Sequence, residues 1–204
     1  MTAQPLPPSL SYRFCRQCFR AFFAVYFRFR VHHPERVPRE GPVILAPNHV
    51  SYTDPVFVVV AMHRLVVGLA RKSAFNVPVG GSILRSWHAI PVDRDGASGN
   101  GLPTILLRLR EGNAVQIFSE GTRSPDGQLQ DAQPGIGLLI LKSDAPVVPV
   151  HLNGAFEAWG RHLTVPRPRR VELTFGQAMD FAELRREARR TKGPAAKSLY
   201  QRAS

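Results

Sequence analysis

Short apolar runs alternate with segments of helical spacing along most of the chain. Runs of strand length occupy residues 43–46, 65–70, 89–92, 114–118 and 147–152, and residues 171–175 alternate apolar and polar positions, as in an edge strand. Residues 55–62, 102–110, 135–142 and 181–190 have the pattern of helices. Strands interleaved with helices predict an α/β protein whose mostly parallel central sheet is flanked by helices.

Residues 11–30 form a separate amphipathic segment that is rich in aromatic side chains and arginine. At helical spacing one face collects six apolar residues: Tyr12, Cys15, Phe19, Phe22, Phe23 and Tyr26. The other side collects four arginines: Arg13, Arg16, Arg20 and Arg28. Rings that enter the acyl boundary beside arginines that meet lipid phosphates are typical of an N-terminal amphipathic interfacial helix. The alternative is that the aromatic face packs on the protein's own core. We favour the membrane surface.

The length and composition predict one main domain. The chain has 204 residues, of which 44% are hydrophobic, and this is enough to bury a substantial core. We divide it into a Pro-rich lead-in, helix and linker (1–40), a catalytic domain (41–190) and a basic tail (191–204). No apolar run is long enough to span a membrane. The arginines in the N-terminal segment argue against a secretory signal, so we expect the protein not to be exported.

The charge of the chain points to an anionic partner. Its formal net charge is +12, which fits nucleic acid, an anionic membrane surface or a phosphorylated substrate. Cys15 and Cys18 are the only two cysteines. No second pair follows at the spacing of a zinc site, and no strand precedes the pair as in redox motifs, so we expect neither a metal nor a redox role there.

Two polar loops each follow an apolar run. His49 and Asp54 come directly after residues 43–46, and the segment 118–124 follows residues 114–117. Because the carboxyl ends of parallel strands meet at one edge of a sheet, these loops predict a single site. Asp54-Pro55 is also typical of a helix start, with Asp as the N-cap and Pro at the first helical position.

A histidine whose ring is oriented by a carboxylate can act as a general base. The chain has no G-x-S-x-G nucleophile motif, and the spacing of Ser51 matches no serine-hydrolase pattern. The substrate is therefore expected to bring the nucleophile as a hydroxyl group.

The second loop is suited to phosphate. Gly121 permits close backbone approach, Thr122 offers a hydroxyl and Arg123 a guanidinium. Arg94 and Lys72, at the ends of other strands, could add positive charge. The alternative is that Glu120 and Arg123 form an internal ion pair that holds the loop.

These residues resemble the glycerolipid acyltransferases, the family that includes lysophosphatidic acid acyltransferases. Four motifs occur in the family's order, over roughly residues 40–155. They read Asn48-His49-Val50-Ser51-Tyr52-Thr53-Asp54, Ile90-Pro91-Val92-Asp93-Arg94, Phe118-Ser119-Glu120-Gly121-Thr122-Arg123-Ser124 and Val148-Pro149-Val150. Three features depart from the family pattern: Ser119 stands where a proline is usual, and a glycine near the second motif and a lysine after the third are absent.

The resemblance implies an activity and a set of roles. His49 would deprotonate the hydroxyl of a lysophospholipid, most simply lysophosphatidic acid, which then attacks an acyl thioester and yields phosphatidic acid for phospholipid biosynthesis. Asp54 would orient His49, and Arg94, Glu120, Gly121 and Arg123 would bind the glycerophosphate. The donor would be acyl-CoA or acyl carrier protein, without a metal or bound cofactor, and the enzyme would sit on the cytoplasmic face of the cell membrane.

Three alternatives remain open at this point. The acceptor could be another lipid alcohol such as glycerol 3-phosphate. The same His–Asp pair could serve a lipid esterase that activates water or Ser51. A non-enzymatic basic module could bind anionic lipid or nucleic acid, although we expect no nucleic-acid partner, because the rings and arginines of residues 11–30 lie on opposite faces.

Overall fold

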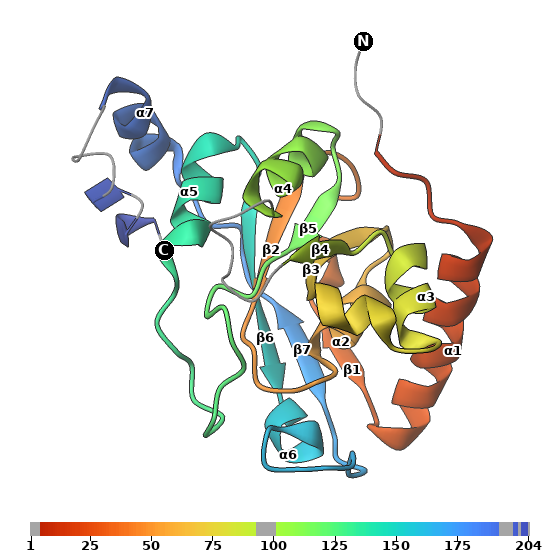
Figure 1. The fold of residues 1–204 in the computed structure, drawn as a ribbon. Helices are drawn as coiled ribbons and strands as arrows, with labels where there is room; N and C mark the ends of the chain where they lie inside the picture. The colour runs from red at the N-terminus through yellow and green to blue at the C-terminus, as the bar shows by residue number, and fades with distance from the viewer. Residues whose placement is uncertain (1–4, 93–100, 192–197, 200, 204) are drawn as a thin grey trace.

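The computed structural model describes residues 5–92, 101–191, 198–199 and 201–203. Its centre is a seven-stranded sheet in the order β1-β7-β6-β2-β5-β3-β4 (Figure 1). In that order the strands are Arg30–His32, Glu172–Phe175, Val147–Asn153, Val43–Pro47, Ala114–Gln116, Val66–Arg71 and Ile90–Val92. Strands β2 to β6 run parallel to one another, and β1 and β7 run the opposite way. The predicted α/β class with a mostly parallel sheet is confirmed.

The central strands are apolar throughout because helices cover both of their faces. Val43, Ile44 and Leu45 of β2 are fully buried. The register places Ile44 between Val115 of β5 and Val147 of β6. Residues 171–175 were expected at an edge of the sheet, but β1 pairs on the outer side of β7, so this prediction was wrong.

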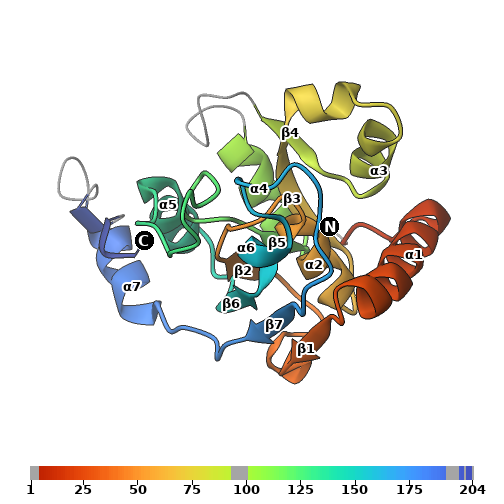
Figure 2. The ribbon, with the colours of Figure 1, turned by 90° about the horizontal axis from the view of Figure 1, so that it is seen from below.

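Helices form a layer on each side of the sheet (Figure 2). One layer contains α4 (Gly101–Arg110) and α5 (Pro134–Lys142), with α7 (Ala182–Arg190) packed on α5. The other contains α1 (Leu10–Tyr26) and α2 (Asp54–Ala61), with α3 (Gly80–Ser86) beside α1. Helix α6 (Ala155–Trp159) lies below the sheet in Figure 1, and two 3₁₀ turns, η1 (Pro34–Arg36) and η2 (Lys72–Asn76), complete the described elements.

The aromatic face of α1 packs on the protein's own core. Tyr12 and Phe23 are each only 1% exposed. The Tyr12 ring meets Trp87 edge-on at 6.2 Å, and the Phe23 ring lies 4.4 Å from Phe57 of α2. The assignment of this face to a membrane surface is therefore corrected. The apolar surface that covers it comes from α2 and the end of α3, which the periodicity of α1 does not reveal.

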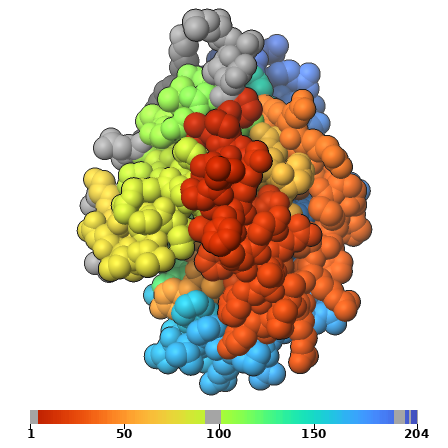
Figure 3. Space-filling view, turned by 90° about the vertical axis from the view of Figure 1, so that its right-hand side faces the viewer, coloured from red at the N-terminus to blue at the C-terminus, as the bar shows by residue number. Residues whose placement is uncertain are grey.

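A different side of α1 is exposed and apolar. Leu10, Phe14, Cys18, Ala21 and Val25 are all exposed, and they recur at intervals of three or four residues, so they form one continuous stripe. We call these five residues the outer stripe. Helix α1 lies across the middle of the face shown in Figure 3. None of the helices among the described residues combines the length and apolar character that crossing a membrane requires.

Residues 10–32, which the sequence placed outside the catalytic domain, contribute to the same core and sheet. Phe27 at the end of α1 is buried. Strand β1 pairs with β7 in parallel, with Val31 opposite Leu173. The N-terminal segment therefore closes one edge of the sheet.

Candidate active site

The His49–Asp54 pair lies where β2 ends and α2 begins, at the carboxyl edge of the sheet. His49 comes two residues after β2, and Asp54 is the first residue of α2. The Nδ1 atom of His49 lies 2.9 Å from Oδ2 of Asp54. Pro55 follows in the first turn of the helix, where its missing N–H costs nothing. Asp54 thus starts the helix and also contacts the histidine.

The carboxylate of Asp54 is held in a fully buried turn. Its Oδ2 atom also accepts hydrogen bonds from the backbone N–H groups of Val50 and Ser51, both at 2.6 Å. Burial raises the pKa of Asp54, and the hydrogen bonds from His49, Ser51 and Val50 act against that rise. Three donors, from His49, Val50 and Ser51, lie within hydrogen-bond distance of this one oxygen. The conformation of the turn therefore requires a hydrogen-bond acceptor at position 54.

The backbone of His49 is held at both of its polar groups by the second loop. Its N–H donates to Oε1 of Glu120 at 2.6 Å, and its carbonyl accepts from the N–H of Ser124 at 2.7 Å. The other oxygen of Glu120 accepts from the backbone and side-chain N–H groups of Gln130 at 3.2 and 3.3 Å. Glu120 is 2% exposed. Both of its oxygens are therefore used inside the protein, to join the two loops.

The imidazole of His49 is packed on one side and reachable on the other. Its ring lies 4.1 Å from the ring of Phe118, and its side chain is 18% exposed. Since Nδ1 faces Asp54, Nε2 is the nitrogen left to face a substrate, and no hydrogen bond to it is found among the described residues. This is the arrangement that a general base requires.

The loop 118–124 places a guanidinium beside the first loop. Gly121 has φ +70°, a conformation that glycine adopts without strain, and Thr122 is exposed. The guanidinium carbon of Arg123 lies 3.6 Å from the centroid of the Tyr52 ring, and this neighbouring guanidinium lowers the pKa of Tyr52. Nη1 of Arg123 has no hydrogen-bond partner within the described residues. Glu120 and Arg123 form no ion pair there, so the internal-pair alternative is not what holds this loop.

The remaining predicted site residues lie farther along the sheet or outside the described part. Lys72 begins η2 directly after β3, so it lies at the same carboxyl edge, with β5 between β3 and β2. Arg94 falls outside the described residues. The described residues contain no group of three or more His, Cys, Asp or Glu side chains placed to hold a metal ion.

Ser51 points away from His49. Its side chain is completely buried, and Oγ donates to the carbonyl of Trp159 at 2.9 Å. Oγ also lies 3.0 Å from the hydroxyl of Thr53. The hydroxyl therefore stabilises the turn between His49 and Asp54 and is not placed as a nucleophile.

Two aromatic residues of this site were not predicted from the sequence. Tyr52 is half exposed beside Arg123, and its ring lies 5.5 Å from that of Trp159. Trp159 comes from α6, and its carbonyl also accepts from the N–H of Tyr52 at 3.2 Å. Tyr52 could have been noticed as a large side chain between the two motif residues, whereas nothing near Trp159 in the sequence signals this contact.

Comparison with known proteins gives a consistent result. A family described as Acyltransferase matches residues 28–153, more than half of the chain. The 1-acyl-sn-glycerol-3-phosphate acyltransferase of Bacillus subtilis is 26% identical over 177 residues, covering 85% of this chain and 86% of that protein. The enzyme of the same name from Limnanthes alba is 33% identical over 128 residues, covering 61% of this chain and 46% of that protein. The chain thus spans most of the first relative and about half of the second.

A solved structure has the same fold. It is the 1-acyl-sn-glycerophosphate acyltransferase PlsC from Thermotoga maritima, with a TM-score of 0.68 and 18% sequence identity. The match covers 93% of this chain and 81% of that one. The fold, the four motifs in order and the family match over residues 28–153 agree, and the predicted resemblance is confirmed: this chain belongs to the acyltransferase family.

Proposed function

We propose that this protein transfers a fatty acyl group from a thioester donor to the free hydroxyl of lysophosphatidic acid, forming phosphatidic acid. The observation that carries the proposal is the pairing of His49 with buried Asp54 at 2.9 Å, beside the Arg123 guanidinium, in a chain of the acyltransferase family. The similarity to enzymes named for 1-acyl-sn-glycerol-3-phosphate supports the choice of acceptor.

The proposed reaction begins with proton transfer. Nε2 of His49 takes the proton of the acceptor hydroxyl as its oxygen attacks the thioester carbonyl. Asp54 fixes the Nδ1–H tautomer and stabilises the imidazolium that forms. When the tetrahedral intermediate collapses, the C–S bond breaks and the thiolate takes the proton back from Nε2. The products are an ester and a free thiol, and His49 returns to its starting state.

Charge near the second loop would hold the acceptor's phosphate. Arg123 presents a guanidinium at the site, and the exposed Thr122 and the backbone of Gly121 stand next to it. Lys72 and Arg94 remain proposed contributors from neighbouring strand ends. For Glu120 we propose a different role from the one the resemblance implies, because both of its oxygens brace the loops.

The proposal includes contact with an anionic membrane through the outer stripe of α1. Phe14 is 71% exposed and Val25 81% exposed, and exposed Arg13 and Arg20 lie on the adjoining side of the helix. Apolar side chains in the acyl boundary with arginines at the phosphates would hold the helix in the plane of the interface. The protein would then work at the cytoplasmic face of the cell membrane, where a lipid acceptor is available.

The site also bears on the competing functions. The orientation of Ser51 disfavours an esterase that uses this hydroxyl as its nucleophile. Glycerol 3-phosphate remains the alternative acceptor, because it presents the same combination of hydroxyl and phosphate. The buried carboxylate that contacts His49 supports an enzyme over a purely binding module.

The deciding experiment is an acyl-transfer assay with the purified protein. Labelled acyl-CoA and acyl carrier protein are each offered with lysophosphatidic acid, glycerol 3-phosphate or no acceptor. We expect transfer to lysophosphatidic acid, a loss of about 10²- to 10⁴-fold in His49→Ala, and unchanged activity in His151→Ala, which removes an exposed histidine. Release of free fatty acid without acceptor would show that water replaces the acceptor and the thioester is hydrolysed, and full activity in His49→Ala would refute the mechanism.

A further inference from the structure

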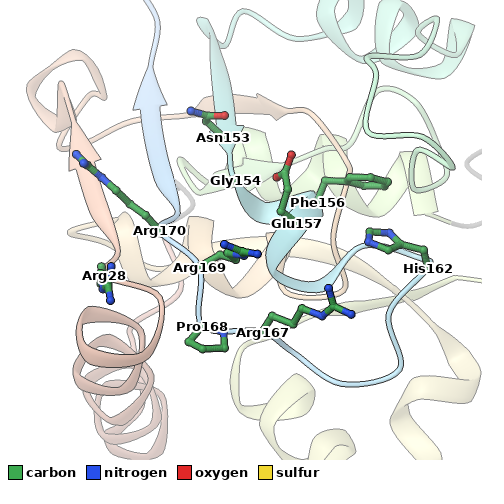
Figure 4. A pocket seen from close by; sticks show the side chains of 10 residues that line it. All are labelled: Arg28, Asn153, Gly154, Phe156, Glu157, His162, Arg167, Pro168, Arg169 and Arg170. Atoms are coloured by element: carbon green, nitrogen blue, oxygen red, sulfur yellow. The ribbon is translucent and has the colours of Figure 1, made fainter.

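A basic hollow of about 630 Å³ lies beside helix α6 (Figure 4). It is bounded by the end of α1, the start of β7 and helix α6. Four arginines line it: Arg28, Arg167, Arg169 and Arg170. We call it the arginine hollow.

Most of the charge in the arginine hollow is not neutralised internally. Arg170 pairs with Glu172 at 2.5 Å. The other three arginines are exposed and form no ion pair among the described residues. Glu157 is the one acidic side chain that lines the hollow. Several guanidinium groups around one concave surface favour a ligand with more than one negative group.

The backbone that carries these arginines is well fixed. The N–H of Arg167 donates to the carbonyl of Ala158 at 2.8 Å, and the hydroxyl of Tyr26 donates to the carbonyl of Pro166 at 2.9 Å. Val171 pairs with the carbonyl of Phe27 at 3.0 Å, which brings the end of α1 beside the start of β7. The hollow is therefore preformed, although its side chains reach into solvent.

Helix α6 connects the arginine hollow to the proposed active site. Phe156 of α6 lines the hollow, and its ring lies against Gly127 in the loop that follows Arg123. At the other end of α6, the Trp159 carbonyl accepts from Ser51 and Tyr52 in the His49 turn. One short helix therefore contacts both the arginine hollow and the turn that carries His49.

The shape and chemistry of the hollow fit a phosphorylated nucleotide. Its volume is within the range of small-molecule sites, about 300 to 1,000 Å³, and a concave surface suits a discrete molecule better than the flat surface of a bilayer. The Phe156 ring lies 4.6 Å from the His162 ring, which offers an aromatic surface for a base. Glu157 can accept a hydrogen bond from an amino group or a ribose hydroxyl.

We propose that the arginine hollow binds the phosphate-bearing nucleotide end of coenzyme A, so that acyl-CoA is the donor; this inference rests on the proposed acyl transfer. In acyl-CoA a long pantetheine arm separates the phosphates from the thioester. A donor of this form needs two sites, one for its anionic end and one for its reacting carbonyl. Helix α6 contacts both places, because Phe156 lines the hollow and the Trp159 carbonyl accepts from the His49 turn.

The test is calorimetric titration of free coenzyme A into the full chain. Arg167→Ala with Arg169→Ala should raise the Kd about tenfold, since each exposed charged contact contributes roughly a factor of three. Higher salt should weaken binding to the wild type. The control is Arg186→Ala with Arg190→Ala, which removes the same charge from the exposed side of α7 and should leave the Kd unchanged. In the transfer assay the first pair should raise KM for acyl-CoA without lowering kcat.

The two proposals fail in different ways. His49→Ala should bind coenzyme A with wild-type affinity, because His49 does not line the hollow. If the wild-type protein bound coenzyme A but transferred no acyl group, the proposed activity would be refuted and the binding site would stand. Equal Kd values in the wild type and the Arg167/Arg169 variant, or no binding to either, would overturn the hollow as the donor site. If that variant lost only its affinity for acyl carrier protein, or only for anionic vesicles, the occupant would be that partner and the proposal would be wrong.

Discussion

Replacing Glu120 with glutamine separates a bracing role from a substrate-binding role. Glu120 is buried and accepts three hydrogen bonds, one from His49 and two from Gln130. Glutamine has nearly the same shape, but only one of its two terminal groups can accept. Whichever way the amide turns, an NH₂ group faces a backbone N–H donor, and one junction between the loops is lost.

The lost hydrogen bond determines the expected changes in the free energy of unfolding, in Tm and in kcat. A hydrogen bond to a charged group contributes about 1.5 to 3 kcal/mol, and an N–H left unpaired in the interior adds to the cost of losing it. We expect Glu120→Gln to unfold about 2 kcal/mol more easily, which lowers Tm by about 4 to 8 °C in a chain of this size. A displacement of His49 by about 1 Å should reduce kcat by up to roughly 100-fold.

The assay compares kcat and KM for lysophosphatidic acid, together with thermal unfolding. A brace predicts a lower kcat and a lower Tm with KM within about threefold of the wild type, because a brace does not bind the acceptor in the ground state. Asp131→Asn, which removes an exposed acid from the same loop, should change none of these quantities. A large rise in KM with kcat and Tm unchanged would refute the bracing role and restore Glu120 as a substrate ligand.

Three further changes test other parts of the structure. Asp54→Asn should abolish most activity. Burial raises the pKa of Asp54, so the protonated form of this carboxyl is favoured by folding. The free energy of unfolding of the wild type, relative to that of the variant, should therefore fall as the pH rises above the ordinary carboxyl pKa, and urea unfolding at several pH values measures it. Gly154→Ala should destabilise the protein by at least 1 kcal/mol, since Gly154 has φ +77° and a Cβ atom would lie 2.2 Å from the carbonyl oxygen of Arg170; a wild-type Tm would contradict this. Phe14→Ser with Val25→Ser should reduce sedimentation with anionic vesicles while Tm stays unchanged, and undiminished sedimentation would exclude the outer stripe as the membrane contact.

Local sequence patterns were sufficient for the parallel strands β2 to β6 and for the first loop, but not for the edge strand β1. The buried strands follow from their continuous apolar runs. Asp54-Pro55 lies at the start of α2, although the N-cap is Thr53 and not Asp54. The closeness of the two loops also followed from topology, because parallel strands deliver their carboxyl ends to one edge. These features depend on short-range chemistry and on one rule of sheet architecture.

Features that depend on partners from distant segments could not be predicted. Periodicity showed which residues of α1 share a face, but not that Phe57 and Trp87 would cover it. The contact of Glu120 with the backbone of His49 joins residues 71 positions apart, and no local pattern in the sequence indicates it. The arginine hollow has the same origin, since the pairing of Val171 with Phe27 brings its arginines together.

The pairing of β1 with β7 also determines when the sheet can be completed during synthesis of the chain. Strand β1 is synthesised before every other strand of the described residues, and its neighbour β7 after all of them; His32 and Glu172, in contact at 3.4 Å, are separated by 140 positions. Contacts of such long sequence separation form late and slow the folding of a domain. Until β7 emerges, the edge of the sheet stays open and the growing chain holds an unpaired N-terminal strand. A chain that stops before residue 172 therefore cannot close its sheet, even though all the residues of the His49 site have already been made.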